Sequence, residues 1–444
     1  MNKKIYYGKE TVKSINNFRL SGKVVDLQLI YALAKVKIAI AETNKTLGRL
    51  DARRCQAIVR AAREVLAGRH DDQFVTDAIQ GGAGTSINMN VNEVLAARAA
   101  EILQNRLSIH PLDHVNLGHS TNDAVPTALR ITLLPLIDRY LASLQLLEKS
   151  FRQKAVRFRA ILKVGRTHLQ DAVPVTLGQE FAAYASLVKR DRQRILAVKK
   201  YLYLTNLGGT AIGTGLNSSR HFIRLSNRNL ARLTRLPLKP APDLIDSTQN
   251  LDVFFHLSSL LNVSASGLSK VCNDLRLMNS GPRAGLAEII LPEKQVGSSI
   301  MPGKVNPVIL ESFNQICFQV SANNEIAMLT VQNGQFELNV MLPVLIKALL
   351  ESLQLLIAGS KTLRQNAVDG IRANHAQCQK YFDHHLGKAT ALIGQIGYDQ
   401  AALLVKKAHQ NGTSLEQELK NLGNTSSHPL QQIFSSKNLT RPKD

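Results

Sequence analysis

The sequence has no tryptophan and only four cysteines among its 444 residues. The cysteines form no CxxC pair and lie near no suitably spaced histidine; they are Cys55, Cys272, Cys317 and Cys378. This spacing fits neither a disulfide framework nor a common zinc site. We interpret all four as buried or incidental thiols of a protein in a reducing compartment.

Long apolar runs and targeting segments are also missing. No uninterrupted apolar stretch approaches the roughly 20 residues that a membrane helix needs. The N-terminal residues MNKKIYYGKE include lysines, but no apolar stretch follows them, which does not fit a signal peptide. We therefore predict a cytoplasmic protein.

Acidic residues are scarce, since 33 Asp and Glu stand against 55 Lys and Arg, giving a formal net charge of +22. Three alternatives stay open for this charge: steering of a small dianionic substrate, non-specific nucleic-acid binding, or a general bias of surface composition. The basic residues are spread along the chain and do not gather in one patch flanked by aromatic residues. We expect a small-molecule partner, and neither a nucleic acid nor a membrane.

Helical periodicity dominates the middle of the chain. Apolar residues recur every three or four positions in five runs, at 131–151, 181–202, 253–277, 308–328 and 344–363. The better strand candidates are 18–25 and 160–164. Gly, Ser, Thr and Asn collect in the connections between the runs. This pattern predicts a bundle of long helices with polar loops at its ends, a rigid arrangement for holding catalytic groups.

The segment richest in chemical groups is 297–307, GSSIMPGKVNP. Its two glycines permit backbone conformations that other residues rarely adopt, and its two prolines limit the alternatives. Ser298 and Ser299 offer hydroxyls, Lys304 offers a positive charge and Asn306 offers an amide. Such a loop can close over an anion and exclude water, although a plain connection between two helices is the alternative.

Three further polar segments are candidates for a site. His168 follows Gly-Arg-Thr at the end of a predicted strand, although a lone histidine in a helical protein is usually structural. The segment 120–123, STND, fits an N-cap or Asx turn, but a helix N-terminus with free N–H groups also binds carboxylates. The segment 84–86, GTS, is polar and uncharged, and a plain loop is its alternative.

GSSIMPGKVNP resembles the signature loop of the aspartase/fumarase superfamily, and the resemblance covers roughly residues 6–397. Supporting segments are GGAGTSINMNVNE, STNDAVPT, GRTHLQDAVPVTLGQE, GGTAIGTGLN and SGPRAG. The resemblance implies a mainly α, three-domain subunit in a homotetramer, with each active site built from loops of three subunits. The implied domains are a mixed, mainly helical N-terminal domain at 1–121, a long-helix bundle carrying the signature loop at 122–376, and a small, shortened C-terminal domain at 377–444.

Several segments resemble aspartases more than fumarases, among them GGAGTS at 81–86, Thr121 and DSTQN at 246–250. The resemblance therefore implies an aspartate ammonia-lyase, which reversibly eliminates ammonia from L-aspartate to give fumarate without a metal or organic cofactor. Fumarate hydratase, or another fumarate-forming lyase of the superfamily, is the nearest alternative. A non-catalytic structural or nucleic-acid-binding member is an alternative of another class.

The resemblance also implies roles for individual residues. Ser298 is the expected base, and His168 and Lys304 are the other catalytic residues. Glu311 is expected to support His168. The implied substrate-binding residues are Thr85, Ser120, Thr121, Asn122, Thr167, Ser299 and Asn306.

Four positions depart from residues that are usual in the family. Lys13 stands in place of Arg, His119 in place of Gln, and Gln332 and Leu342 in place of Glu. The basic tail after Gly397 matches the family only loosely. These departures leave substrate preference and regulation open, but they do not fall on the predicted catalytic positions.

Overall fold

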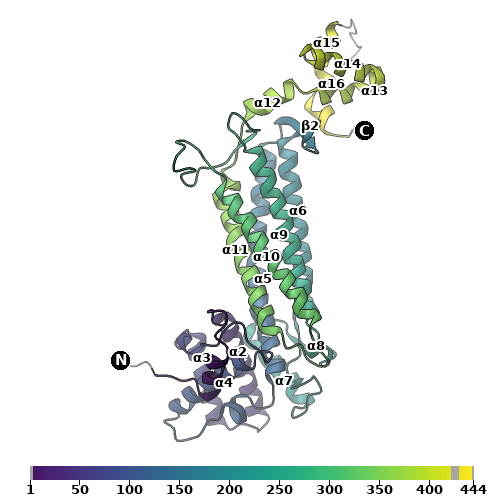
Figure 1. Cartoon of the computed structure of the whole chain (residues 1–444). Helices are drawn as coiled ribbons and strands as arrows, with labels where there is room; N and C mark the ends of the chain where they lie inside the picture. Colours follow the sequence, from purple (N-terminus) through teal and green to yellow (C-terminus); the bar gives the residue numbers. More distant parts are fainter. Residues whose placement is uncertain (1–3, 422–429, 443–444) are drawn as a thin grey trace. The chain divides into compact units, whose positions relative to one another are not determined.

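The computed structural model describes residues 4–421 and 430–442. The chain is mainly helical, which confirms the predicted fold class (Figure 1). It divides into two compact units. Unit 1 comprises Met1–Leu141, Gln193–Ala265 and Phe318–Ile357, and unit 2 comprises Ala142–Arg192, Ser266–Cys317 and Ala358–Asp444. The division into three domains stays a prediction.

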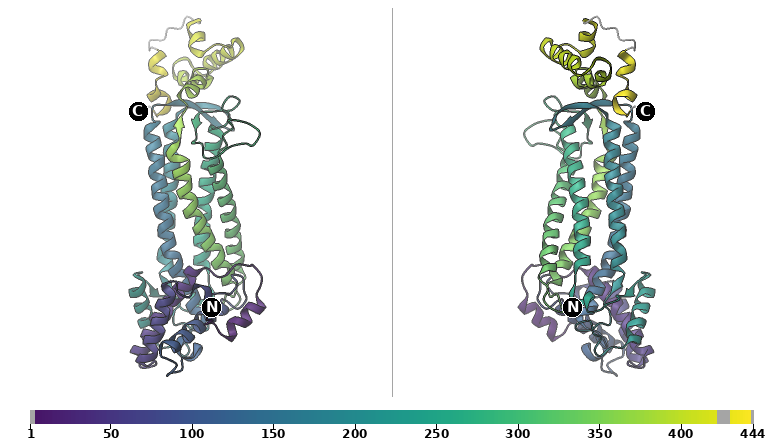
Figure 2. Two further views of the ribbon diagram at one scale, coloured as in Figure 1. Left: turned by 90° about the vertical axis from the view of Figure 1, so that its left-hand side faces the viewer. Right: turned by 90° about the vertical axis from the view of Figure 1, so that its right-hand side faces the viewer.

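Five long helices correspond to the five predicted runs, and the further views show their continuous ribbons (Figure 2). They are α5 (Thr121–Arg157), α6 (Leu177–Leu202), α9 (Asp252–Met278), α10 (Val308–Gln332) and α11 (Leu342–Asn366). The division between the two units falls inside each of them. Many of their periodic apolar side chains are fully buried, as at Leu147, Phe181 and Leu257. Burial of this apolar face is the main source of helix stability in such a protein.

Unit 1 also contains shorter helices around α2, which is buried on nearly every side and packs against α3, α4 and α7. The carboxylates of Asp26 and Asp51 cap α2 and α3 by accepting hydrogen bonds from backbone N–H groups in their first turns. The elements are α1 (Lys9–Asn17), α2 (Leu27–Thr46), α3 (Ala52–Leu66), η1 (Asp71–Gln73), α4 (Thr85–Ile102), η2 (Pro111–Val115), β3 (Leu204–Thr205), α7 (Arg220–Thr234), β4 (Lys239–Pro240) and α8 (Asp246–Gln249).

Unit 2 carries an antiparallel hairpin and a cluster of short C-terminal helices around Leu392, Leu404 and Leu415. The strands are β1 (Leu162–Thr167), β2 (Gln170–Thr176), β5 (Ile289–Ile290) and β6 (Arg372–Ala373). The shorter helices are η3 (Val368–Gly370), α12 (His375–Asp383), η4 (Leu386–Leu392), α13 (Ile393–Ile396), α14 (Tyr398–Asn411), α15 (Leu415–Asn421), α16 (Leu430–Ile433) and α17 (Ser436–Thr440).

One of the two strand predictions is wrong. The candidate at 160–164 overlaps β1, but 18–25 forms a turn with a single bridge between Val24 and Asp77. The reason is the Asp77 carboxylate, which accepts hydrogen bonds from the backbone N–H groups of Leu20 and Ser21 and so holds the segment in a turn.

The cysteines and α11 bear on two other sequence interpretations. All four cysteines are free and buried, as predicted, and burial raises the pKa of Cys317 to about 12.

By length and composition the segment Leu342–Gly370 could cross a membrane, with a mean hydropathy of 1.6 over its most apolar window. Because 61% of that window is buried inside the protein, it has the character of a core helix.

Candidate active site

Two helix N-termini lie side by side in unit 1, and each helix begins with a threonine. α4 begins at Thr85, after a glycine-rich turn in which Gly84 has a φ of +92°. A Cβ at Gly84 would lie 3.2 Å from the side chain of Val125 on α5, so the close approach of the two helices favours glycine. Thr121 is the first residue of α5. Its hydroxyl accepts a hydrogen bond of 3.1 Å from the Asn88 Nδ2 group of α4. The positive ends of two helix dipoles therefore meet, which favours an anion.

A buried carboxylate fixes the start of α5. The fully buried Asp123 side chain accepts hydrogen bonds from the backbone N–H groups of Ser120, Gly208 and Thr210 at 2.9–3.0 Å. Burial raises the pKa of Asp123 to about 6. This carboxylate ties the predicted STND segment to the glycine-rich turn that follows β3, and thereby positions Ser120.

The Asn122 side chain has a defined orientation. Its Nδ2 group donates to the Ala211 carbonyl at 2.7 Å, and its own backbone carbonyl accepts from Asn206 at 2.9 Å. Because Ala211 supplies an acceptor, the amide nitrogen of Asn122 must face it. The carbonyl oxygen Oδ1 is therefore the end of the amide left to accept a hydrogen bond from a ligand.

The signature loop in unit 2 connects β5 to α10 and closes on itself. Asn306 Nδ2 donates to the Gly297 carbonyl at 2.6 Å. A Cβ at Gly297 would clash with the carbonyl oxygen of Lys304, so this close approach requires glycine. The Ser298 hydroxyl oxygen accepts hydrogen bonds from the backbone N–H groups of Ile300 and Met301 at 3.2 and 3.0 Å. Such donors stabilise negative charge on this oxygen.

Lys304 and Asn306 line a cavity of about 1080 Å³ in unit 2, together with Arg276 and Arg372. The lining also includes one carboxylate, that of Glu293, so the three cationic side chains leave a net positive charge that favours an anionic ligand. Ser298 and Ser299 lie on the same loop but are not among the residues that line this cavity.

Thr167 and His168 lie at the tip of the β1–β2 hairpin and are exposed. His168 and Leu169 form its two-residue turn with φ values of +55° and +59°, between the paired residues Thr167 and Gln170. Left-handed backbone at two consecutive non-glycine residues costs roughly 1–2 kcal/mol each. A two-residue hairpin turn favours this backbone geometry, so the strain follows from the turn.

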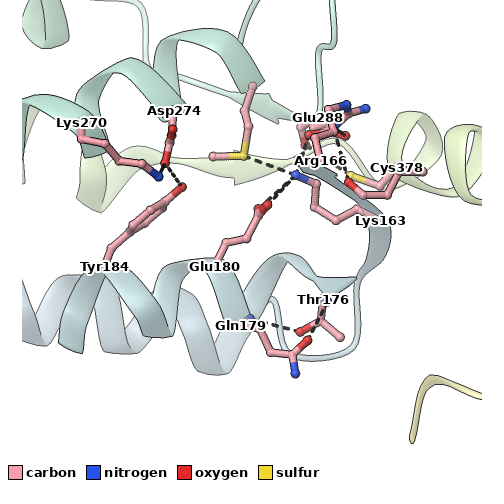
Figure 3. Close-up of polar contacts among 12 residues, drawn as sticks. Lys163, Arg166, Thr176, Gln179, Glu180, Tyr184, Lys270, Asp274, Glu288 and Cys378 are labelled. Carbon is pink, nitrogen blue, oxygen red and sulfur yellow. Dashed lines mark hydrogen bonds and ion pairs between the residues drawn. The ribbon is translucent and has the colours of Figure 1, made fainter. Parts of the chain in front are cut away.

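A buried ion network anchors this hairpin (Figure 3). The fully buried Glu288 carboxylate lies 2.8 Å from Arg166 Nη1 and 2.8 Å from Lys163 Nζ. Lys163 also lies 2.9 Å from Glu180 of α6. Sequence reasoning missed Lys163 and Glu288. The available signal was a pair of charged residues within apolar stretches, ILKV and AEII, where an unpaired charge is costly.

The predicted site residues fall into two groups. Unit 1 holds Thr85, Ser120, Thr121 and Asn122, and unit 2 holds Thr167, His168, Ser298, Ser299, Lys304, Asn306 and Glu311. Glu311 lies 3.8 Å from Arg276 in an ion pair, so its support of His168 stays a prediction, as do the other assigned roles. Over residues 4–421 and 430–442, no three His, Cys, Asp or Glu side chains gather into a group that could hold a metal ion.

Comparison with protein families gives two matches. The family described as Lyase matches residues 2–322, and the family described as Fumarase C C-terminus matches residues 389–441. The loosely matching C-terminal tail is thus covered by a family pattern.

Comparison with individual proteins gives matches along the whole chain. An aspartate ammonia-lyase of a Bacillus species is 44% identical over 99% of this chain and 95% of its own length. A class II fumarate hydratase of Bradyrhizobium diazoefficiens is 42% identical over 98% of this chain and 93% of its own length. The crystal structure of a fumarate lyase:delta crystallin from Brucella melitensis bound to cobalt has a TM-score of 0.93 at 40% identity, covering 98% of this chain and 95% of that one.

Proposed function

The chain belongs to the lyase family of the aspartase/fumarase superfamily, and on this premise we propose that it is a carbon–nitrogen lyase, an aspartate ammonia-lyase. It reversibly eliminates ammonia from L-aspartate to give fumarate. The observation that carries the lyase assignment is the closed signature loop, which holds Ser298 together with Lys304 and Asn306, two residues that line a cationic cavity.

The chemical difficulty is the weak acidity of a C–H bond beside a carboxylate. Its deprotonation by Ser298 produces an enediolate-like group that carries two negative charges. Thr85, Ser120, Thr121 and Ser299 donate hydrogen bonds to this group, where preorganised donors are most effective. A free hydroxyl is too weak a base, so Ser298 acts as an alkoxide. Its oxygen accepts hydrogen bonds from two backbone N–H groups of the loop, and Lys304 lies on the same loop. These groups favour the alkoxide form of Ser298.

The rest of the substrate is held by two other sets of groups. Lys304 and Asn306 bind the second carboxylate, and Thr167, His168 and Asn122 surround the departing amine. The fixed orientation of Asn122 fits an ammonium, because its Oδ1 accepts and an ammonium offers three donors. An ammonium already carries its proton, so the elimination requires no strong general acid.

The assembly is the one that membership of the aspartase/fumarase superfamily implies. We propose a cytoplasmic homotetramer in which loops of three subunits supply one site. Ser298 and Ser299 then meet the carboxylate-binding helix starts of another subunit. The exposed apolar side chains of the loop support a contact of this kind, since Val296 and Ile300 are 80% and 83% exposed.

The test is an absorbance assay of fumarate formation by the purified protein, with L-aspartate and with L-malate in parallel. Turnover of L-aspartate alone is the expected result. Turnover of L-malate alone assigns the fumarase reaction instead, which the 42% identity to a fumarate hydratase makes the second candidate. No turnover of either substrate, together with a salt-dependent shift of nucleic acid in a gel, would favour the non-catalytic alternative.

A further inference from the structure

A buried lysine lies directly behind the helix starts of unit 1. The Lys37 side chain of α2 is fully buried, and its Nζ lies 2.7 Å from Asn88 Oδ1, 2.9 Å from Asn116 Oδ1 and 2.7 Å from His119 Nε2. An ammonium has three donors and no acceptor, so these three acceptors satisfy it completely. Burial lowers the pKa of Lys37 to about 7, and the charge of Asp123 opposes this shift.

The lysine determines how the Asn88 amide is oriented. Since an ammonium only donates, the oxygen of Asn88 must face Lys37 and its nitrogen must face the other way. That nitrogen donates to the Thr121 hydroxyl at 3.1 Å and to Asn116 Oδ1 at 3.0 Å. The Thr121 oxygen therefore already accepts a hydrogen bond from the protein, and its own hydrogen is directed to another acceptor.

We propose that Asn88, held by the Lys37 ammonium, is a positioning residue that makes the Thr121 hydroxyl a fixed hydrogen-bond donor to the substrate carboxylate on which negative charge develops. The inference rests on the proposed function, in which Thr121 binds this carboxylate. A chain of hydrogen bonds that starts at a cation polarises each member, so the last donor is strengthened. A donor that is already oriented needs no reorganisation as the charge forms.

His119 completes the arrangement. Its Nε2 accepts from Lys37, and its Nδ1 lies 3.4 Å from the Leu117 carbonyl, so the neutral ring with a proton on Nδ1 fits both neighbours. Burial and the Lys37 charge hold the pKa of His119 well below its usual range. In this chain, the histidine thus serves as a neutral acceptor at the position where family members usually have glutamine.

Asn88→Asp tests the proposal because it keeps the shape of the side chain but removes both hydrogen bonds that the Asn88 nitrogen donates, to the Thr121 hydroxyl and to Asn116 Oδ1. A carboxylate still accepts from Lys37, but it cannot donate to Thr121, whose hydroxyl then turns back toward it. We expect kcat/KM for L-aspartate at pH 6.5 to fall about 100-fold, the usual effect of losing one such donor. The matched control is Asn90→Asp, on the same helix and equally buried, whose partners are the backbone groups of Gln73 and Val75. We expect the control to lose thermal stability and to keep kcat/KM within about threefold.

A double-mutant cycle separates this role from a merely structural one. If Asn88 acts through Thr121, Asn88→Asp lowers kcat/KM in the wild type but causes little further loss in a Thr121→Val background. Independent, multiplicative losses, or a folded Asn88→Asp protein with wild-type kcat/KM, would overturn the proposal. If Asn88→Asp does not fold, Asn88→Ser takes its place in the cycle, because its shorter side chain no longer reaches Thr121.

A binding measurement separates the inference from the proposed function. Calorimetry with succinate, which has the two carboxylates and no leaving group, reports the Thr121 donor without turnover. If the wild type binds succinate but turns over neither L-aspartate nor L-malate, the proposed function is wrong. The succinate affinities of the wild type and Asn88→Asp then still test the role of Asn88. If the wild type neither binds succinate nor turns over a substrate, both the proposed function and the role of Asn88 are wrong.

Discussion

The guanidinium of Arg166 lies 2.8 Å from a carboxylate oxygen of Glu288, and the Glu288 side chain is entirely buried. Arg166 immediately precedes Thr167 and His168 at the tip of the β1–β2 hairpin. The ion pair therefore fixes the end of the strand that carries two predicted amine-binding residues. It also stabilises a hairpin whose turn has left-handed backbone at two non-glycine residues.

Glu288→Gln should destabilise the protein strongly, because the change removes the carboxylate that the buried Lys163 and the partly buried Arg166 share. Removing one partner of a buried ion pair costs about 3–5 kcal/mol of the free energy of unfolding. Urea denaturation measures this loss, and turnover should fall with it as the hairpin loosens. The control is the exposed Glu325→Gln, for which we expect a change within about 0.5 kcal/mol. Equal stability of the two variants would contradict the anchoring role.

The architecture could be predicted because periodic apolar residues decide where long helices form. The runs at 253–277 and 308–328 correspond closely to α9 and α10. The strand predicted at 18–25 failed because the Asp77 carboxylate, distant in sequence, captures its backbone N–H groups. The pattern of residues within 18–25 carries no information about a hydrogen-bond partner as distant in sequence as Asp77, so the strand prediction could not have been corrected from the sequence.

The candidate site could be predicted only as a set of residues. The sequence identified Ser298 and Lys304 by their loop, but neither the self-closing bond between Asn306 and Gly297 nor the cavity follows from composition. The Lys37 and Glu288 networks were missed because each consists of side chains far apart in sequence. Their existence depends on tertiary packing, which compels every buried charge to find partners.

Ser298→Ala should abolish turnover while leaving substrate binding nearly intact. The methyl group cannot accept a proton, and a positioned base typically contributes about 10²–10⁴-fold to the rate. We expect kcat for L-aspartate to fall by this factor, with KM changed less than about threefold, as measured by initial-rate kinetics. A variant that keeps more than a tenth of the wild-type kcat would remove Ser298 from the role of base.

Lys304→Met should raise KM more than it lowers kcat, the reverse of the effect expected for Ser298→Ala. The substitution keeps much of the side-chain length but removes the charge that faces the cavity beside Arg276. A hydrogen bond to a charged group contributes about 1.5–3 kcal/mol, so we expect KM to rise about 10- to 100-fold. Calorimetric titration with succinate checks the same loss without turnover. Unchanged succinate affinity would show that Lys304 does not bind a carboxylate.

Acid stability should depend on Glu64, which Arg98 contacts through two nitrogens at 2.6 and 3.1 Å. The Arg98 hydrogen bonds, opposed by burial and aided by His70, lower the pKa of Glu64 from 4.5 to about 2. Because the folded-state pKa is depressed, its contribution is present above pH 4.5 and is lost as the pH falls toward 2. Thermal unfolding at pH 5 and pH 3 should show that the wild type loses on the order of 2 kcal/mol more of its free energy of unfolding than Glu64→Gln does over this range. The exposed Glu337→Gln should keep the wild-type pH dependence.

Gly297→Ala should disable the signature loop without unfolding the protein. The added methyl group would clash with the Lys304 carbonyl, so the two ends of the loop must separate and the bond from Asn306 to the Gly297 carbonyl must break. Ser298 and Lys304 would then no longer share one fixed loop geometry, and misplacement of this size costs about 10²-fold in rate. We expect kcat/KM to fall at least that far, while the melting temperature stays within a few degrees because Ser299 to Val305 are exposed.

The matched control for this prediction lies in the same loop. Gly303 has a φ of +77° and no neighbouring atom within 4 Å of an added Cβ, so Gly303→Ala tests backbone strain without a clash. Left-handed strain of about 1–2 kcal/mol predicts a loss of roughly 10-fold in kcat/KM at this position. If the two alanine variants lose equal activity, strain alone explains both, and the contact between Gly297 and Lys304 is not what shapes the loop.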